Sequence, residues 1–261
     1  MPAPVLTPSS TGVALPQVTL AAITSIAPEA TARAVALSMA GIAFGEVLWI
    51  SDLAPPPSLA GRVRWEPIAP LTSRDAYSRF MLRDLAGLVG TDHVLCVQWD
   101  GHVIDPARWD PAFLDFDYIG AVWPQFRDGA VVGNGGFSLR SRRLLQACAA
   151  LPGCGPEAED VFICRTMRSR LERDHAIRFA PPELAARFAY ERERGTAPAF
   201  GFHGVFNLVE LVSDREAAGL VAQLPMRSLA RNELREIGWW ALRHGRLRLA
   251  AEVARRWRRW L

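Results

Sequence analysis

The chain contains no lysine, so its 30 strongly basic side chains are all arginines. A nucleoside-triphosphate P-loop requires a Lys-Ser/Thr ending followed by a helix. The glycine-rich stretch at residues 133–136 lacks that ending and leads into an expected strand. The sequence therefore excludes a phosphate loop of that class. From the arginine content alone we infer no partner.

Cysteine is also scarce, with only Cys96, Cys148, Cys154 and Cys164. Their spacing lacks the paired Cys-x-x-Cys arrangement of a structural zinc site. Thiols of cytoplasmic proteins are normally reduced. We therefore expect buried or bystander thiols.

Long hydrophobic runs are missing. Polar or small residues interrupt the apolar stretches Val18–Ile26 and Ala34–Ile50 before they reach the length of a bilayer span. Met1–Ser10 has neither a basic residue nor an apolar run, which argues against a secretory signal. We expect a cytoplasmic protein without a transmembrane helix.

Length and charge indicate one catalytic domain with an appendage. A chain of 261 residues, half of them hydrophobic, can bury one large core. The net charge is only +3, but arginines crowd the C-terminal end. We expect a flexible leader over residues 1–16, a catalytic domain over residues 17–225 and an Arg/Trp-rich helical appendage over residues 226–261.

The hydrophobic pattern alternates between strand and helix periods, which predicts an α/β fold. Val18–Ile26 and Glu46–Asp52 are apolar and rich in β-branched residues, as buried parallel strands are. A helical pattern that opens at Pro28 separates them and completes a β-α-β unit. Arg62–Ile68 is a candidate third strand.

A second unit follows. Ser73–Val89 has an N-cap residue and helical spacing, and His93–Asp100 is a strand with a polar tip. Ligands collect at the carboxyl ends of strands in open α/β sheets, so chemistry is expected first at this tip. Downstream, the pattern predicts strands over Phe116–Ala121 and Gly136–Arg140, helices over Ser141–Ala150 and Glu159–Arg173, and a helical hairpin over Ser228–Leu261.

The tip Gln98-Trp-Asp-Gly101 can carry chemistry. The carboxylate of Asp100 can bind Mg²⁺ or Mn²⁺ that also contacts a diphosphate. We expect Gln98 to contact the donor beside Asp100. It stands where many such enzymes carry a first acidic residue. The alternative is that Asp100-Gly101 is only a turn after the strand.

Three glycines in Gly133-Asn-Gly-Gly-Phe-Ser-Leu-Arg140 allow the backbone to approach a ligand closely. Asn134 can hydrogen-bond sugar hydroxyls, and Gly135 and Gly136 fit a wall beneath a donor sugar. A plain hairpin turn is the alternative.

Two further positions can act on a substrate. Glu159 and Asp160 precede a helical pattern, where one carboxylate can serve as general base for an acceptor hydroxyl. Acidic residues at a helix start are also ordinary capping and dipole partners. His203, which lies between glycines in the aromatic segment Phe200-Gly-Phe-His-Gly204, can supply an imidazole to a metal or a hydrogen bond to a phosphate. A structural histidine is the alternative.

Taken in order, five segments resemble a bacterial family of unknown-function domains that looks like the glycosyltransferases of the GT-A fold. The resemblance runs from about Val18 to about Leu208. It implies a Rossmann-like nucleotide-binding half followed by an acceptor-binding half, with a mixed central sheet. The segments are Gln98-Trp-Asp-Gly101, Asp117-Tyr-Ile-Gly-Ala-Val-Trp-Pro124, Gly133-Asn-Gly-Gly-Phe-Ser-Leu-Arg-Ser141, Glu159-Asp-Val-Phe162 and Phe202-His-Gly204.

The resemblance also implies roles. Asp100 takes the position of the acid that contacts metal or diphosphate, and His203 that of a late metal ligand. Residues 134–136 line the donor sugar. The pair Glu159 and Asp160 matches the acids that often contain the base of inverting enzymes, and we favour Asp160.

Position in such folds suggests further contacts. Ser25 and Asp52 end the first two strands, where the nucleotide base and ribose bind, and Tyr77 adds to the donor site. Tyr118 and Trp123 are expected on the acceptor side, because aromatic faces stack on pyranose rings. Core packing is the alternative for both.

We therefore expect an inverting glycosyltransferase of polysaccharide biosynthesis, with a nucleotide-sugar donor and a glycan, lipid-linked or lipopolysaccharide acceptor. The base deprotonates the acceptor while a divalent cation or local donors stabilise the leaving nucleoside diphosphate. One alternative is a metal-dependent phosphohydrolase or nucleotidyltransferase that uses Asp100, Asp160 and His203. Another is a non-catalytic nucleotide-sugar or carbohydrate-binding module, which Gln98 in place of an acid favours.

The C-terminal segment contains Trp239, Trp240, Trp257 and Trp260 among its arginines. Such a segment can lie on an anionic membrane that carries the acceptor, at the inner face. A hairpin packed on the core, or an oligomer interface, is the alternative. No nucleic-acid motif accompanies these residues, so we expect no nucleic-acid partner.

Overall fold

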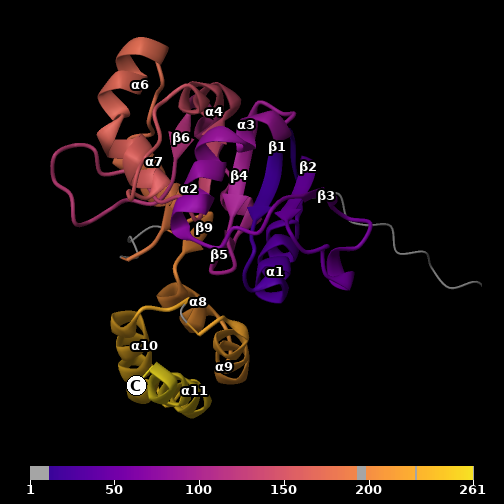
Figure 1. Cartoon of the computed structure of the whole chain (residues 1–261), viewed down its shortest axis with the longest axis vertical. Coiled ribbons are helices and arrows are strands. Elements are labelled where there is room, and N and C mark those ends of the chain that lie inside the picture. The colour runs from indigo at the N-terminus through magenta and orange to yellow at the C-terminus, as the bar shows by residue number, and fades with distance from the viewer. Residues whose placement is uncertain (1–11, 193–197, 227, 261) are drawn as a thin grey trace, which may run out of the picture.

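A computed structural model describes residues 12–192, 198–226 and 228–260 of the chain. Within those residues, the central sheet has six strands in the order β3-β2-β1-β4-β7-β6 (Figure 1). The first four in this order are parallel, whereas β7 is antiparallel to β4 and β6 is antiparallel to β7. The strands are β1 (Val13–Ile23), β2 (Ile42–Ser51), β3 (Arg64–Pro67), β4 (His93–Val97), β6 (Tyr118–Ile119) and β7 (Ser138–Ser141). The expected α/β class with a mixed central sheet is confirmed.

The parallel half has the 3-2-1-4 strand order of Rossmann-like nucleotide-binding folds. Helices α1 (Pro28–Ser38) and α7 (Pro182–Phe188) pack on one face of the sheet. Helices α2 (Arg74–Arg83), α3 (Leu85–Leu88) and α4 (Arg142–Ala149) pack on the other. Alternate strand residues therefore enter different cores, as Leu20 and Ala21 do. Burial on both faces explains why β4 and the second half of β1 are apolar without alternation.

Strand β1 begins at Val13, upstream of the expected start at Val18. Val13–Leu15 pairs with β2, and the register shifts between Leu15 and Thr19, where Pro16 interrupts the apolar pattern. Gly45 of β2 has no side chain to collide with the Pro16 backbone there. Of the predicted leader, residues 1–11 lie outside the described residues.

The second half of the chain adds a small sheet in the order β5-β9-β8. It consists of β5 (Gly101–Val103), β8 (Ala189–Tyr190) and β9 (Gly201–His203). β5 pairs antiparallel with β9, which places Gly101 opposite His203. The helix expected over 159–173 is divided into α5 (Glu159–Val161), a π-helical turn (Phe162–Thr166) and α6 (Arg168–His175). Such π turns are frequent at functional sites.

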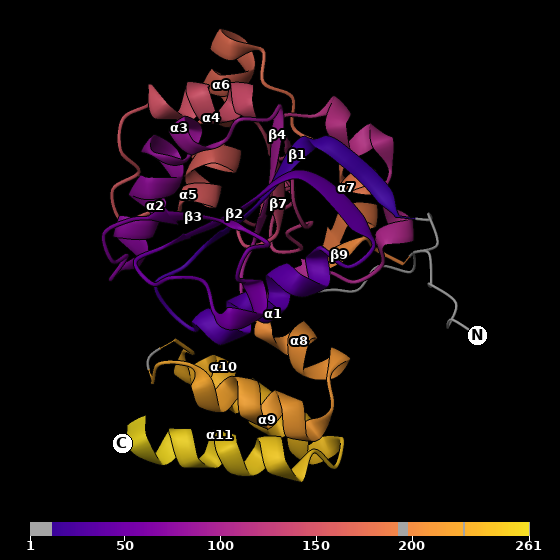
Figure 2. The same ribbon diagram turned by 90° about the vertical axis from the view of Figure 1, so that its right-hand side faces the viewer.

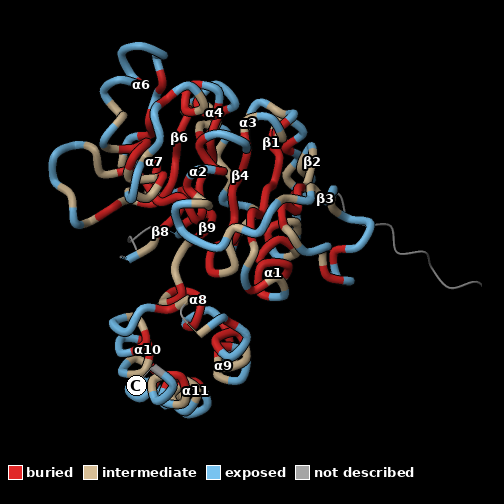
Figure 3. Tube along the Cα trace, viewed as in Figure 1, coloured by how far each residue is buried: buried red, intermediate tan, exposed pale blue. Residues whose placement is uncertain are grey.

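The chain ends in a helical unit of α8 (Val205–Leu211), α9 (Asp214–Gln223), α10 (Arg231–Arg243) and α11 (Leu247–Trp260), which lies below α1 in Figures 1 and 2. The expected C-terminal hairpin is confirmed as α10 and α11. These helices share an apolar cluster with α8 and α9, and their outward residues are exposed (Figure 3). None of the helices in the described ranges has the length and hydrophobicity needed to cross a membrane.

Candidate functional site

A pocket of about 430 Å³ lies at the carboxyl ends of β1 and β4. Residues 24–26, directly after β1, line it together with Gln98 and Trp99, directly after β4. The strand order reverses direction between these two strands. Such a switch point is where open α/β sheets bind their ligands.

The start of α2 forms another wall of this pocket through residues 71–74. Ser73 caps the helix by accepting a hydrogen bond of 3.1 Å from the amide of Ala76. Ser25 accepts a hydrogen bond of 2.8 Å from the amide of Leu71, which ties this segment to β1. The N-terminus of α2 and Arg74 together favour an anionic group in the pocket. Arg74 is an exposed residue whose guanidinium also donates to the carbonyl of Pro156 at 2.9 Å.

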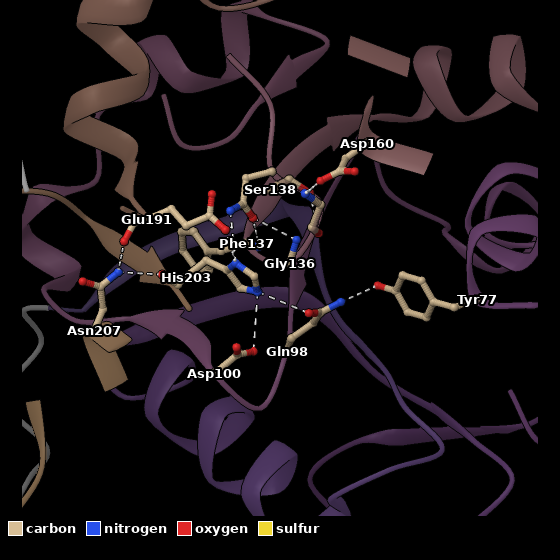
Figure 4. Close-up of polar contacts among 12 residues, drawn as sticks. Tyr77, Gln98, Asp100, Gly136, Phe137, Ser138, Asp160, Glu191, His203 and Asn207 are labelled. Atoms are coloured by element: carbon tan, nitrogen blue, oxygen red, sulfur yellow. Dashed lines mark hydrogen bonds and ion pairs between the residues drawn. The ribbon is translucent and has the colours of Figure 1, made fainter. Parts of the chain in front are cut away.

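Gln98 connects the pocket to a polar network (Figure 4). Its Nε2 donates to the hydroxyl of Tyr77 at 2.9 Å, and its Oε1 lies 3.3 Å from Nε2 of His203. Burial raises the pKa of Tyr77 far above its ordinary value, so the phenol is neutral. Tyr77 and Gln98, which were both expected to contact the donor, thus lie together at the pocket.

His203 lies between two carboxylates. Its Nε2 is 3.5 Å from Oδ1 of Asp100, and its Nδ1 is 3.3 Å from Oε1 of Glu191. Burial alone would lower the pKa of His203, but the charges and hydrogen bonds of Asp100 and Glu191 outweigh it and raise the pKa to about 10. At neutral pH the imidazole is therefore protonated.

The glycine loop is shaped by Asn134, which has a left-handed φ of 74° and is 2% exposed. Its Oδ1 accepts hydrogen bonds from the amides of Gly136 (3.0 Å) and Phe137 (3.3 Å), and its Nδ2 lies 3.0 Å from Nδ1 of His203. In this conformation the carboxamide oxygen of Asn134, which was expected to face sugar hydroxyls, is occupied by two backbone amides.

The glycines of this loop leave space that side chains of the protein itself occupy. A Cβ at Gly136 would overlap with the imidazole of His203, and a Cβ at Gly135 would overlap with the carboxylate of Glu159. The glycines were expected to let a ligand approach the backbone closely. The loop instead needs glycine because His203 and Glu159 press against its backbone.

The two adjacent acids have different surroundings. Glu159 is 4% exposed and forms an ion pair of 2.9 Å with Arg140, which is fully buried. Burial raises the pKa of Glu159 despite the opposing charge of Arg140. Asp160 is partly exposed and accepts hydrogen bonds of 2.8 Å from the amides of Gly135 and Val161. Of the pair, Asp160 is the carboxylate with access to solvent.

The two aromatic residues expected on the acceptor side are buried. Tyr118 is 0% exposed, and its hydroxyl donates to the carbonyl of Asn134 at 3.0 Å. Trp123 is 5% exposed and lies so close to Gly133 that a Cβ there would overlap its ring. The expected stacking role is wrong for both, because core packing covers their faces.

Asp52 does not line the pocket that Ser25, Tyr77 and Gln98 share. It follows β2, and its Oδ1 is buried without a hydrogen-bond partner. The expected ribose contact of Asp52 therefore lacks structural support. The pocket lies at the ends of β1 and β4, and β2 is the neighbour of β1 on the side away from β4.

Sequence reasoning did not identify Glu191, Arg140, Trp99 or Arg74 as site residues. Glu191 reaches His203 because β8 pairs in parallel with β9, and neither short strand has a hydrophobic pattern that predicts this pairing. Arg140 offered a signal, since it is an arginine inside an otherwise buried strand and such a charge requires an acidic partner.

Asp100 and His203 would fit a divalent cation if the imidazole lost its proton. Oδ1 of Asp100 is buried and lies 3.5 Å from Nε2 of His203, too far for a strong hydrogen bond. Gln98 presents an amide oxygen to the same nitrogen. Within the described residues, no group of three or more His, Cys, Asp or Glu side chains could hold a metal by itself. A cation here therefore depends on oxygens of the bound substrate or water to complete its coordination.

Residues 62–203 match the family described as "Protein of unknown function (DUF5672)". The chain belongs to this family. The matched part runs from β3 through β9, so it contains Gln98, the glycine loop, Asp160 and His203 but neither β1 nor the C-terminal helices. No curated protein matches the chain.

Among solved structures, the chain is similar to a glycosyltransferase involved in the glycosylation of the major capsid of PBCV-1. The two chains are 13% identical with a TM-score of 0.44, and the match covers 71% of this chain and 91% of that one.

Proposed function

We propose that this protein is an inverting glycosyltransferase that moves a sugar from a nucleoside-diphosphate sugar to an acceptor hydroxyl. The position of Gln98 carries the proposal. At the switch point of the sheet, its side chain joins Tyr77 in the pocket to His203 in a network of charged groups. A pocket and a candidate reaction centre thus share one side chain. The Rossmann-like strand order supports the GT-A resemblance of the five motifs.

The pocket suits a nucleoside diphosphate. Its lining is largely apolar and includes the rings of Tyr77 and Trp99, against which a nucleobase can pack. Arg74 and the N-terminus of α2 supply positive charge for the diphosphate. The pocket therefore binds the donor in this proposal, and its sugar points toward the glycine loop.

Asp160 is the proposed base. Its carboxylate accepts the proton of the acceptor hydroxyl, and the acceptor oxygen forms a bond to the anomeric carbon. The bond between that carbon and the diphosphate oxygen breaks, and its electron pair leaves with the nucleoside diphosphate. Asp100 and His203 would hold a divalent cation, which when bound offsets the charge of the leaving diphosphate. Glu159 is not available for the proton transfer, because it pairs with Arg140.

Donor binding is the first test. A panel of uridine and guanosine diphosphate sugars is titrated by calorimetry into the wild-type protein and Arg74→Ala, with and without Mn²⁺. We expect one donor class to bind and Arg74→Ala to weaken it by about tenfold or more, as for a lost charged hydrogen bond. Arg79→Ala, a change of an exposed arginine on the same helix, is the matched control. No binding by any donor would contradict the proposal.

Turnover distinguishes the alternatives. The bound donor is incubated with glycan and lipid-linked acceptors, and both nucleoside diphosphate and glycosylated product are measured. Release of free phosphate without a glycosylated product would favour a phosphohydrolase. Donor binding without turnover across the acceptors would favour a binding module. The neutral Gln98, in the place of an acidic residue, agrees with that alternative.

A further inference from the structure

The outer face of the α10–α11 hairpin carries large exposed hydrophobic side chains. Leu247 is 69% exposed, Trp239 65% and Leu242 59%, which are the highest values for large hydrophobic residues in the described part of the chain. The three side chains line an open groove of about 590 Å³ between the two helices. An apolar patch of this kind marks an interaction surface.

The fold of the hairpin does not require this groove to be covered. Away from the groove, Ile237 and Ala241 of α10 and Leu249 of α11 are buried in the apolar cluster that these helices share with α8 and α9. Arg256, which is 1% exposed, fixes α11 further by donating to the carbonyls of Leu224 and Pro225. The exposed apolar residues are therefore additional to those that hold the helical unit together.

The charge around the groove is strongly positive. Residues 226–261 contain ten arginines and three acidic residues, whereas residues 1–225 contain twenty arginines and 24 acidic residues. Arg235 and Arg258 line the groove, and Arg243 lies beside Trp239 in an adjoining depression. All three arginines are exposed. The long apolar stem of arginine can lie on a hydrophobic surface while its guanidinium reaches a charged layer above it.

We propose that this face docks on the surface of a bilayer that contains anionic lipids. Tryptophan and leucine would enter the boundary between headgroups and acyl chains, and the arginines would contact lipid phosphates. A second copy of the chain fits less well, because pairing of two such faces would bring two arginine-rich rims together. The side chain of Trp260 lies outside the described part of the structure and is not needed for the argument.

The position of the hairpin supports a bilayer as the partner. α11 lies at the end of the molecule farthest from the sheet, so a planar surface can reach it without touching the sheet (Figures 1 and 2). The segment that leads into α10 contributes Pro225 and Ser228 to the pocket at the sheet. Docking would therefore hold the pocket near a lipid surface, whatever reaction the pocket serves.

Cosedimentation of the full-length protein with vesicles tests the proposal. The vesicles contain phosphatidylcholine alone or phosphatidylcholine with phosphatidylglycerol, at low and high salt. We expect binding to the mixed vesicles, at least tenfold weaker binding to neutral ones, and loss of affinity as salt rises. Two variants are compared: Trp239→Ser/Leu242→Ser/Leu247→Ser and Arg235→Ser/Arg243→Ser/Arg258→Ser. Each should lose at least tenfold in affinity.

Controls separate docking from folding. Leu53→Ser and Arg79→Ser replace exposed residues of the same types elsewhere and should bind vesicles as the wild type does. Thermal unfolding followed by circular dichroism should be similar for all variants. Failure of the wild type to bind mixed vesicles, or full binding by the apolar triple variant, would overturn the proposal. So would a dimer in sedimentation velocity that the apolar variant dissociates while vesicle binding is absent.

Discussion

The carboxylate of Asp160 accepts a hydrogen bond of 2.8 Å from the backbone amide of Gly135. This contact joins the start of α5 to the glycine loop, which also presses against His203. The neighbouring Glu159 points into the protein and pairs with Arg140. A carboxylate with solvent access is therefore fixed at the loop where the proposed donor sugar lies.

Asp160→Asn tests the proposed base. The carbonyl oxygen of the asparagine can still accept the hydrogen bond from Gly135, whereas the one from Val161 is lost, and the side chain cannot take a proton from an acceptor. We expect donor affinity within about threefold of the wild type and transfer slowed by about 10²–10⁴-fold, the usual contribution of a general base. Glu157→Gln, a carboxylate change three residues upstream, is the control for turnover assays. Unchanged turnover of Asp160→Asn would exclude the assigned role.

Glu159→Gln tests the buried ion pair. The change leaves the guanidinium of Arg140 buried without a countercharge, so we expect the free energy of unfolding to fall by about 3–5 kcal/mol. Urea titration followed by circular dichroism measures it. The double variant Arg140→Met/Glu159→Leu should recover most of the loss, since it removes both charges. A loss as small as that of a surface carboxylate would show that Arg140 is not dependent on this partner.

Gly136→Ala tests the contact between the glycine loop and His203. The added methyl group would overlap with the imidazole, so the loop or the histidine must move. We expect a loss of stability of about 1–3 kcal/mol from overpacking, together with weaker donor binding. Gly219→Ala in α9, where a Cβ meets no neighbour, is the control and should be neutral or stabilising. Equal stability of the two variants would contradict the packing described here.

Asp117 links stability to acid pH. It accepts hydrogen bonds from Ser141, Arg143 and the amide of Arg178, and these outweigh burial and lower its pKa below the ordinary 3.8. The contribution of Asp117 to the free energy of unfolding is therefore complete above about pH 4. It is lost as the pH falls through the depressed pKa of the folded state.

Asp117→Asn should accordingly flatten the acid limb of the stability curve and cost about 1.5–3 kcal/mol near neutral pH. Denaturant titrations at about pH 2 to about pH 7 provide the curve. Asp128→Asn, which breaks an exposed ion pair with Arg165, should change stability little. An acid limb as steep as that of the wild type would show that other carboxylates dominate it.

Metal binding at His203 should release a proton. The pKa of His203 is raised to about 10, so a metal ion that binds its Nε2 at neutral pH must displace the proton on that nitrogen. Calorimetric titration of Mn²⁺ in the presence of donor, in buffers of different ionisation enthalpy, measures the protons released. We expect about one per ion for the wild type and none for His203→Gln. Binding of Mn²⁺ without proton release would place the ion elsewhere.

The sequence predicted the parallel half of the sheet because its strands are buried on both faces and therefore form continuous apolar runs. It also located the polar ends of those strands, where Ser25 and Gln98 reach one pocket. The start of β1 was missed, since Pro16 breaks the apolar pattern while the strand continues. A local pattern cannot show that Gly45 accommodates that irregularity.

The sequence by itself therefore determined the α/β class, the C-terminal hairpin and the choice of residues near the strand ends, because periodicity and strand termination are local properties of a chain. Only the tertiary structure decided that Glu159 is paired with Arg140, that Tyr118 is buried, and that Glu191 reaches His203. These relationships depend on which strands and helices pack against each other. Contacts between residues distant in sequence fix that packing, and no period along the chain encodes them.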